Sequence, residues 1–93
     1  MKVLDSKTSK RAKGEIWFGI PTWDPADRGG ERSVKFAYPI ANGRWARTSP
    51  EVPEAVVWEM LLTLVHQGRL AEILGKKDQS DIKEVVRALE ALT

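Results

Sequence analysis

Residues 36–48, FAYPIANGRWART, carry the clearest structural signal in this sequence. Two short runs of β-favouring residues flank Asn42 and Gly43. An Asn-Gly pair is the strongest short-range hairpin signal, because both residues tolerate the positive φ angles of a tight turn. We therefore expect a strand over residues 33–40 and a return strand over residues 44–48.

The predicted register of this hairpin determines which side chains share a face. A two-residue turn places Ile40 opposite Trp45 and Tyr38 opposite Arg47. Alternation then gathers the apolar side chains of the hairpin on one face, which we expect to be core. These side chains are Phe36, Tyr38, Ile40 and Trp45.

An earlier strand is expected over residues 15–22, EIWFGIPT. Its alternation turns Ile16, Phe18 and Ile20 to one side and Trp17 to the other. A loop follows, because the stretch after this strand contains Asp-Pro and Gly-Gly turn signals and no apolar period. It is longer than most hairpin connections.

The second half of the chain reads as helical. A helix is expected within residues 49–68, a short helix over 69–74 that Gly75 stops, and an amphipathic helix over 81–92. The sequence thus predicts an α+β fold in which a small antiparallel sheet of about three N-terminal strands packs against two main C-terminal helices. We expect one domain over residues 14–93, preceded by a flexible basic tail over 1–13.

The first long helix is unusually apolar. Between Ala55 and Val65 only Glu59 and Thr63 are polar. Such a wide apolar face indicates either a central helix flanked on two sides or a homodimer interface. The candidate interface residues are Val57, Trp58, Leu61, Leu62 and Val65.

Composition excludes several classes of protein. The 93 residues suit one modest core, and the absence of cysteine removes disulfides, thiolate nucleophiles and zinc ribbons. No stretch approaches the roughly 20 apolar residues needed to cross a bilayer, and the basic N-terminus lacks a signal-peptide core. We expect a cytoplasmic protein that does not enter membranes.

Catalytic chemistry is weakly represented. His66, the only histidine, is expected near the end of a helix, where it interacts favourably with the dipole. Asp24 and Asp27 share a loop without a calcium-ligand pattern, and Gly29-Gly30 opens no phosphate-binding helix. We therefore expect no enzyme, no bound cofactor and no metal site.

Charge is distributed unevenly along the chain. Residues 1–48 carry ten Lys or Arg against five acids, whereas residues 49–93 carry five against eight. A basic half indicates an anionic partner, and nucleic acid is the partner that we predict. Trp17 and Trp23 are the expected exposed rings on which bases could stack. The candidate nucleic-acid-binding residues are Lys10, Arg11, Lys13, Trp17, Trp23, Arg28, Arg32, Lys35, Arg44 and Arg47.

Two resemblances bear on this prediction. The order of basic Ser/Lys tail, antiparallel sheet and apolar helix, over roughly residues 1–67, resembles the layout of single-stranded-DNA-binding transcriptional coactivators. Residues 69–92, RLAEILGKKDQSDIKEVVRALEAL, resemble the helix-turn-helix of bacterial regulators, with Leu70, Ala71, Glu72, Leu74 and Gly75 in the matching order. However, the helix that would read DNA leans acidic, which suits a phosphate-lined groove poorly.

The predicted function is a small non-enzymatic nucleic-acid-binding protein, either a transcription-regulatory or a single-stranded-DNA-binding factor, that uses its basic tail and hairpin. The alternative is a protein-interaction module, a dimeric adaptor or inhibitor. It would use the apolar helix of residues 55–65 and the exposed sheet edge that Pro39 marks.

Overall fold

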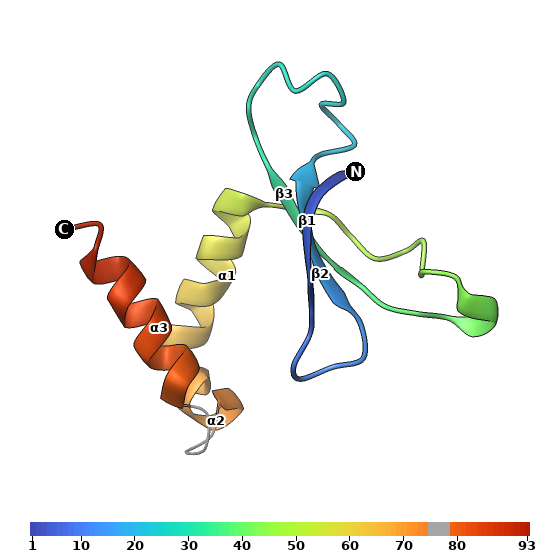
Figure 1. Ribbon diagram of the computed structural model, residues 1–93. Helices are drawn as coiled ribbons and strands as arrows, with labels where there is room; N and C mark the ends of the chain where they lie inside the picture. Colours follow the sequence, from blue (N-terminus) through green and yellow to red (C-terminus); the bar gives the residue numbers. More distant parts are fainter. Residues whose placement is uncertain (75–78) are drawn as a thin grey trace. The chain divides into compact units, whose positions relative to one another are not determined.

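The computed structural model describes residues 1–74 and 79–93 (Figure 1). Four strands come first: β1 (Lys2–Thr8), β2 (Glu15–Ile20), β3 (Ser33–Ala37) and β4 (Val52–Pro53). The helices are the short 3₁₀ turn η1 (Ala41–Gly43), then α1 (Glu54–His66), α2 (Arg69–Leu74) and α3 (Gln79–Glu90). The predicted α+β class is confirmed, with four strands in the sheet instead of about three.

The sheet is an antiparallel meander in the order β1-β2-β3-β4. Trp17 of β2 lies between Ser6 of β1 and Lys35 of β3, while Ile16 lies between Lys7 and Phe36. Directly opposed residues share a face, so this register gives the sheet two different sides. One side carries Trp17 and the other carries the apolar residues of β2.

Strand β1 corrects the prediction of a flexible tail over residues 1–13. All seven residues of Lys2–Thr8 are exposed, yet they pair with β2 through a register that shifts between Val3 and Asp5. A strand at the edge of a sheet is held by its backbone and needs no apolar period. That is why a polar, basic sequence without periodicity forms a strand here.

Gly19 is the residue that permits β1 to lie so close to β2. A Cβ atom built on Gly19 would lie 2.1 Å from the carbonyl oxygen of Lys2. No side-chain carbon tolerates a backbone oxygen at that distance, so β1 could not keep this position against any other residue. Close approach of two backbones is the physical reason for glycine in this strand.

The turn of the hairpin holds three residues, not two. The backbone N–H of Ile40 donates to the oxygen of Arg44 over 2.8 Å, which leaves residues 41–43 as the loop. Asn42 and Gly43 have φ angles of 66° and 69°, as the sequence pattern predicted for this pair. The extra residue changes the register of the return segment.

The expected pairing of Ile40 with Trp45 is therefore wrong. Trp45 instead lies opposite Pro39, and the N–H of Ala46 donates to the oxygen of Tyr38 over 2.9 Å. A shift by one residue moves every following side chain to the other face. Trp45 consequently leaves the face of Tyr38 and joins that of Trp17.

The predicted apolar core of the hairpin is also corrected. The buried apolar residues of the described chain are Ile20, Ala37 and Ala46. The four side chains expected in the core, which are Phe36, Tyr38, Ile40 and Trp45, are all 36–48% exposed. On the apolar side of the sheet Ile20 is buried, but Ile16, Phe18 and Phe36 stay exposed, so alternation produced an apolar face that is mostly not buried.

A polar network fastens the start of β1 to the sheet. Glu51 accepts hydrogen bonds from the backbone N–H and hydroxyl of Thr22 and from the hydroxyl of Ser33. The amino group of Met1 donates to the Thr22 hydroxyl over 2.6 Å and lies 3.9 Å from the Glu51 carboxylate. Burial alone would raise the pKa of Glu51, but the hydrogen bonds from Thr22 and Ser33 and the Met1 charge lower it.

The chain divides into two compact units, residues 1–59 and 60–93, where one domain over residues 14–93 was expected. Helix α1 begins in the first unit and ends in the second. Gly68, with a φ of 65°, ends this helix as predicted, and its N–H donates to the oxygen of Val65. Gly75, the expected stop of the short helix, lies outside the described residues. None of the described helices is long and apolar enough to cross a bilayer.

Candidate nucleic-acid interface

Trp17 and Trp45 form the centre of the candidate interface. Their ring centroids lie 5.3 Å apart with an interplanar angle of 70°, an edge-to-face contact. The ammonium group of Lys35, which is directly opposite Trp17 in the sheet, lies 5.4 Å from the Trp17 ring centroid. The indole N–H of Trp17 donates to Glu15 over 2.8 Å, which fixes the ring orientation. We call Trp17, Lys35 and Trp45 the tryptophan face.

Two arginines flank the tryptophan face. Arg44 comes directly before Trp45 in the return segment and Arg47 two residues after it, and both arginines are exposed. Neither makes an ion pair within the part of the chain that the structure describes. Trp45 is exposed, whereas Trp17, which the sequence predicted to be exposed, is half-buried. Unpaired guanidinium groups beside an exposed indole ring can bind phosphate while a base stacks on the ring.

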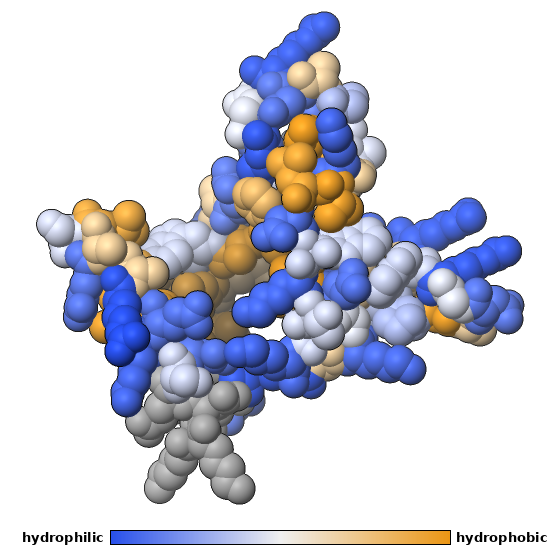
Figure 2. Space-filling model, viewed as in Figure 1, coloured by the Kyte–Doolittle hydropathy of each residue, from blue (hydrophilic) through white to orange (hydrophobic). Residues whose placement is uncertain are grey.

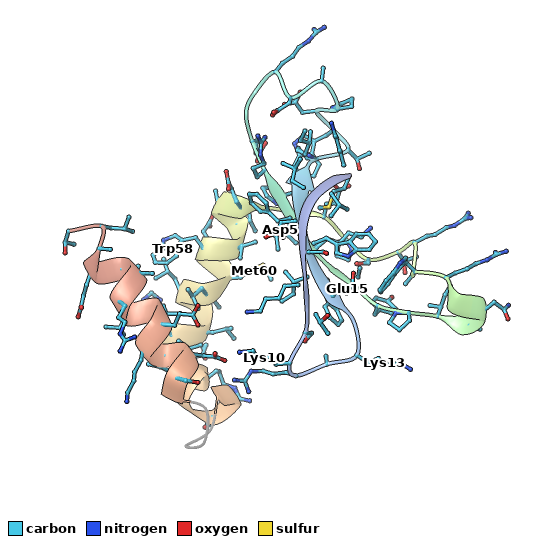
Figure 3. The ribbon with its side chains drawn as sticks, in the orientation of Figure 1. Asp5, Lys10, Lys13, Glu15, Trp58 and Met60 are labelled. Atoms are coloured by element: carbon cyan, nitrogen blue, oxygen red, sulfur yellow. The ribbon has the colours of Figure 1, made fainter. Side chains whose placement is uncertain are left out.

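The hairpin loop of residues 9–14 adds three cations at the same end of the sheet. Because Glu15 pairs with Ala37, the start of β2 lies beside the end of β3, from which the 38–48 hairpin emerges. The loop carries Lys10 and Lys13 (Figure 3) and, between them, Arg11. The hydroxyl of Ser9 accepts the backbone N–H groups of Arg11 and Ala12, so the loop has a defined turn.

The remaining predicted residues belong to the opposite end of the sheet. Trp23, Arg28 and Arg32 lie on the loop that joins the end of β2 to the start of β3 (Figure 1). The indole N–H of Trp23 donates to Glu31 over 3.2 Å, so this exposed ring has an acidic neighbour. The structure therefore divides the ten candidates into two groups.

Arg32 is engaged in the structure of its loop. Its guanidinium donates to both carboxylate oxygens of Asp27, over 2.7 and 3.2 Å, and the hydrogen bond to Asp27 raises the pKa of Arg32. Asp24 accepts the backbone N–H groups of Arg28 and Gly29. These carboxylates hold the loop together, and within the described residues no cluster of acids or histidines could hold a metal ion.

Trp45 is the member of the interface that sequence reasoning missed. The prediction assigned it to the core because a two-residue turn puts it on the face of Tyr38. Pro39 offered a signal for the correct register. Along a hairpin strand every second residue forms backbone hydrogen bonds across to the other strand, and proline, which has no N–H, suits a position between two such residues. Tyr38 and Ile40 are these residues, and each makes the backbone bond described above.

The predicted dimer residues all lie on α1. Trp58, Leu62 and Val65 are exposed by 49%, 37% and 48%, whereas Val57 and Leu61 are half-buried. No residue of α1 is buried. Trp58 and Met60 project from different sides of the helix (Figure 3), so its apolar character extends around it.

Helix α3 presents an apolar stripe of its own. Its exposed apolar residues are Ile82, Val85, Val86 and Leu89, followed by Leu92 just after the helix. The space-filling view shows apolar side chains at the surface of the molecule (Figure 2). The unit of residues 60–93, which we call the helical unit, thus has apolar surface that water covers in the single chain.

Comparison of this chain with protein-family models, curated proteins and solved structures gives no match.

Proposed function

We propose that this protein binds single-stranded nucleic acid without catalysing a reaction. Unpaired bases would stack on the tryptophan face, and their phosphates would bind Arg44, Arg47 and the cations of the 9–14 loop. The observation that carries the proposal is the exposed Trp45 in contact with the half-buried Trp17, beside cations at one end of the sheet. Stacking platforms next to basic side chains are the common design of sites for unpaired strands.

A single strand is favoured over a duplex by the chemistry of the aromatic groups. An indole ring offers a flat face, which can stack on an unpaired base but not on a base inside a duplex. The helical element in the described hairpin, η1, has three residues and is too short to enter a major groove. A role in transcription regulation is compatible with this binding and stays a prediction from the sequence.

The test measures the fluorescence anisotropy of a labelled 20-nucleotide single strand and of the matching duplex as protein is added, at several salt concentrations. We expect the single strand to bind more tightly and its affinity to fall steeply with salt, because released counterions drive such binding. Changing Arg44→Glu with Arg47→Glu should reduce the slope of log K against log salt by about 1.4, which is about 0.7 per lost phosphate contact.

The matched control is Lys83→Glu with Arg87→Glu. It changes the net charge of the chain by the same amount but acts on exposed residues of α3. If the two double variants lose equal affinity for the single strand, only the net charge matters, and the hairpin is not the site. Absence of binding to either probe at low salt would reject the proposal.

We also propose that the chain acts as a homodimer through α1. The exposed apolar residues of α1 and α3 support this, since a monomer gains little by leaving so many apolar side chains in water. The same observation favours the second candidate function, a protein-interaction module whose partner covers these helices. A homodimer needs no further protein, so the oligomeric state of the isolated chain distinguishes a homodimer from a module that docks on a different protein.

A further inference from the structure

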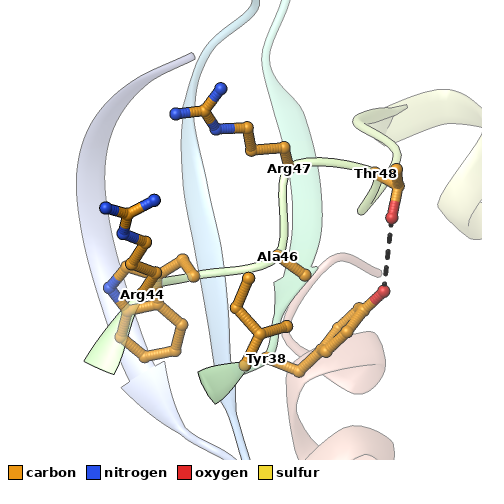
Figure 4. A pocket seen from close by; sticks show the side chains of 7 residues that line it. Tyr38, Arg44, Ala46, Arg47 and Thr48 are labelled. Carbon is orange, nitrogen blue, oxygen red and sulfur yellow. Dashed lines mark hydrogen bonds between the residues drawn. The ribbon is translucent and has the colours of Figure 1, made fainter. Parts of the chain in front are cut away.

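The hairpin of residues 38–48 encloses an open hollow of about 500 Å³ (Figure 4). All seven residues that line it come from this one segment: Tyr38, Ile40, Arg44, Trp45, Ala46, Arg47 and Thr48. Its size lies in the range of sites for small molecules, which is about 300–1,000 Å³. One nucleotide fits such a volume, whereas an extended polymer follows a groove.

The apolar part of the lining suits a flat ring. Trp45 and Tyr38 are 40% and 36% exposed, and Ile40 beside them is 48% exposed. Ala46 is buried and keeps the floor close to the backbone. Aromatic rings stack on any nucleobase, and a branched aliphatic side chain packs against it, so this part of the lining gives affinity without selectivity.

The two hydroxyl groups of the lining can supply selectivity. The Tyr38 hydroxyl and the Thr48 hydroxyl lie 3.5 Å apart, at the outer limit of hydrogen bonding (Figure 4). Each hydroxyl can donate one hydrogen bond and accept two, so a contact this long leaves most of their capacity unused. They are the uncharged polar side chains of the hollow, and base edges are recognised by such groups.

The charged part of the lining consists of Arg44 and Arg47. Both guanidinium groups lie at the hollow without an acidic partner among the described residues. A guanidinium binds phosphate with two parallel hydrogen bonds. The ring surface, the uncharged hydroxyls and the two cations of this hollow match the face of a base, the edge of a base and a phosphate.

We propose that this hollow is a base-selective subsite, in which one unpaired nucleotide of the bound strand packs its base against the apolar lining and turns the edge of the base toward the hydroxyls of Tyr38 and Thr48. The proposal depends on the proposed function and adds to it. The tryptophan face and arginines bind any strand, whereas the hydroxyl pair makes the protein prefer one base.

The experiment compares the affinities of the wild-type protein for dA12, dC12 and dT12 by anisotropy at one salt concentration. One or two hydrogen bonds to a base edge should make the tightest and weakest homopolymers differ by about threefold to tenfold. The variant Tyr38→Phe with Thr48→Val should reduce this ratio to less than about twofold, and each single change should reduce it in part. Thr93→Val, which removes a hydroxyl in the helical unit, is the control and should keep the wild-type ratio.

A second measurement locates the base directly. A dT12 strand with one 4-thiothymidine is photo-crosslinked to the wild-type protein, which is then digested with trypsin. We expect the crosslink in the peptides of residues 36–44, 45–47 or the start of the next one, because these contain the lining residues. This readout needs no variant, so it holds even if the double variant fails to fold.

The outcomes separate this inference from the proposed function. Equal affinities for all three homopolymers, a preference that survives removal of both hydroxyls, or crosslinks confined to other peptides would overturn the subsite while leaving strand binding intact. Absence of binding to every homopolymer at low salt would overturn both.

Discussion

Trp17 of β2 and Trp45 of the return segment contact each other edge to face, with their ring centroids 5.3 Å apart. The contact exists because the hairpin turn has three residues and shifts Trp45 to the side of the sheet that Trp17 occupies. Two rings and the neighbouring Lys35 thereby form one surface from three separate parts of the sequence.

Replacement of Trp45 should weaken strand binding. In Trp45→Leu the side chain stays apolar but loses its stacking face, and we expect the binding free energy for a single strand to fall by about 1–3 kcal/mol. Anisotropy titration with a labelled 20-mer measures it. Trp23→Ala is the comparison, because that ring is as exposed but bonds to Glu31 at the other end of the sheet.

We expect the Trp23 variant to change affinity by less than about twofold, since it removes no base contact of the proposed site. A larger loss in the Trp23 variant than in Trp45→Leu would place the stacking surface on the long loop. Circular dichroism should be recorded for both variants to check that they fold, because the edge-to-face contact itself contributes about 0.5–1.5 kcal/mol to folding.

Gly19 should be the least replaceable residue of the sheet. In Gly19→Ala the new Cβ would lie 2.1 Å from the Lys2 oxygen, so β1 must move away from β2. We expect the free energy of unfolding in urea to fall by more than about 2 kcal/mol, a loss typical of backbone displacement. Hydrogen exchange should show reduced protection of the β1 amides.

Gly43→Ala is the matched control for this substitution. Gly43 has a φ of 69° but nothing within 4 Å of the added Cβ, so the change costs only the strain of a left-handed residue, about 1 kcal/mol. If the two variants lose equal stability, close approach of the strands is not the reason for Gly19.

The sequence predicted those features that local patterns determine. The alternation of residues 15–20 placed Trp17 and Ile16 on different faces of the sheet, and the Asn42-Gly43 pair located the turn. Both depend on the conformational preferences of neighbouring residues, which a single sequence contains.

The features that failed depend on one residue of register or on pairing between distant segments. Nothing in Lys2–Thr8 marks it as a strand, because its partner β2 and the glycine that admits it lie elsewhere in the sequence. Trp45 was assigned to the wrong face by a turn one residue too short. Burial could not be predicted either, since an apolar pattern indicates a face but not what covers it.

The Glu51 network predicts a stability that depends on pH. The folded state lowers the pKa of Glu51, so its stabilising effect is complete above the unfolded pKa of about 4.3 and is lost as pH falls through the folded pKa. We expect Glu51→Gln to reduce the free energy of unfolding by about 1–2 kcal/mol at pH 7.

Urea unfolding at pH 7, 5 and 3 measures this effect. The difference between wild type and Glu51→Gln should stay constant from pH 7 to pH 5 and shrink toward pH 3, because the carboxylate is then protonated in both folded and unfolded chains. Thr22→Val removes one of the donors and should weaken the same pH dependence. A difference that does not change down to pH 3 would contradict the role of the Glu51 charge.

Substitution of α1 tests the proposed dimer. Leu62→Glu with Val65→Glu puts two carboxylates on the exposed apolar surface of the helix. If a second copy covers this surface, each change removes about 1.5–3 kcal/mol of apolar burial and adds the cost of desolvating a charge, so the dimer dissociation constant should rise more than about 100-fold. Sedimentation velocity at tens of micromolar protein should give a dimer for the wild type and a monomer for the variant.

Lys83→Glu on the polar side of α3 is the control and should remain dimeric. A wild type that sediments as a monomer at every concentration would reject the homodimer and favour a different protein as the occupant of these helices.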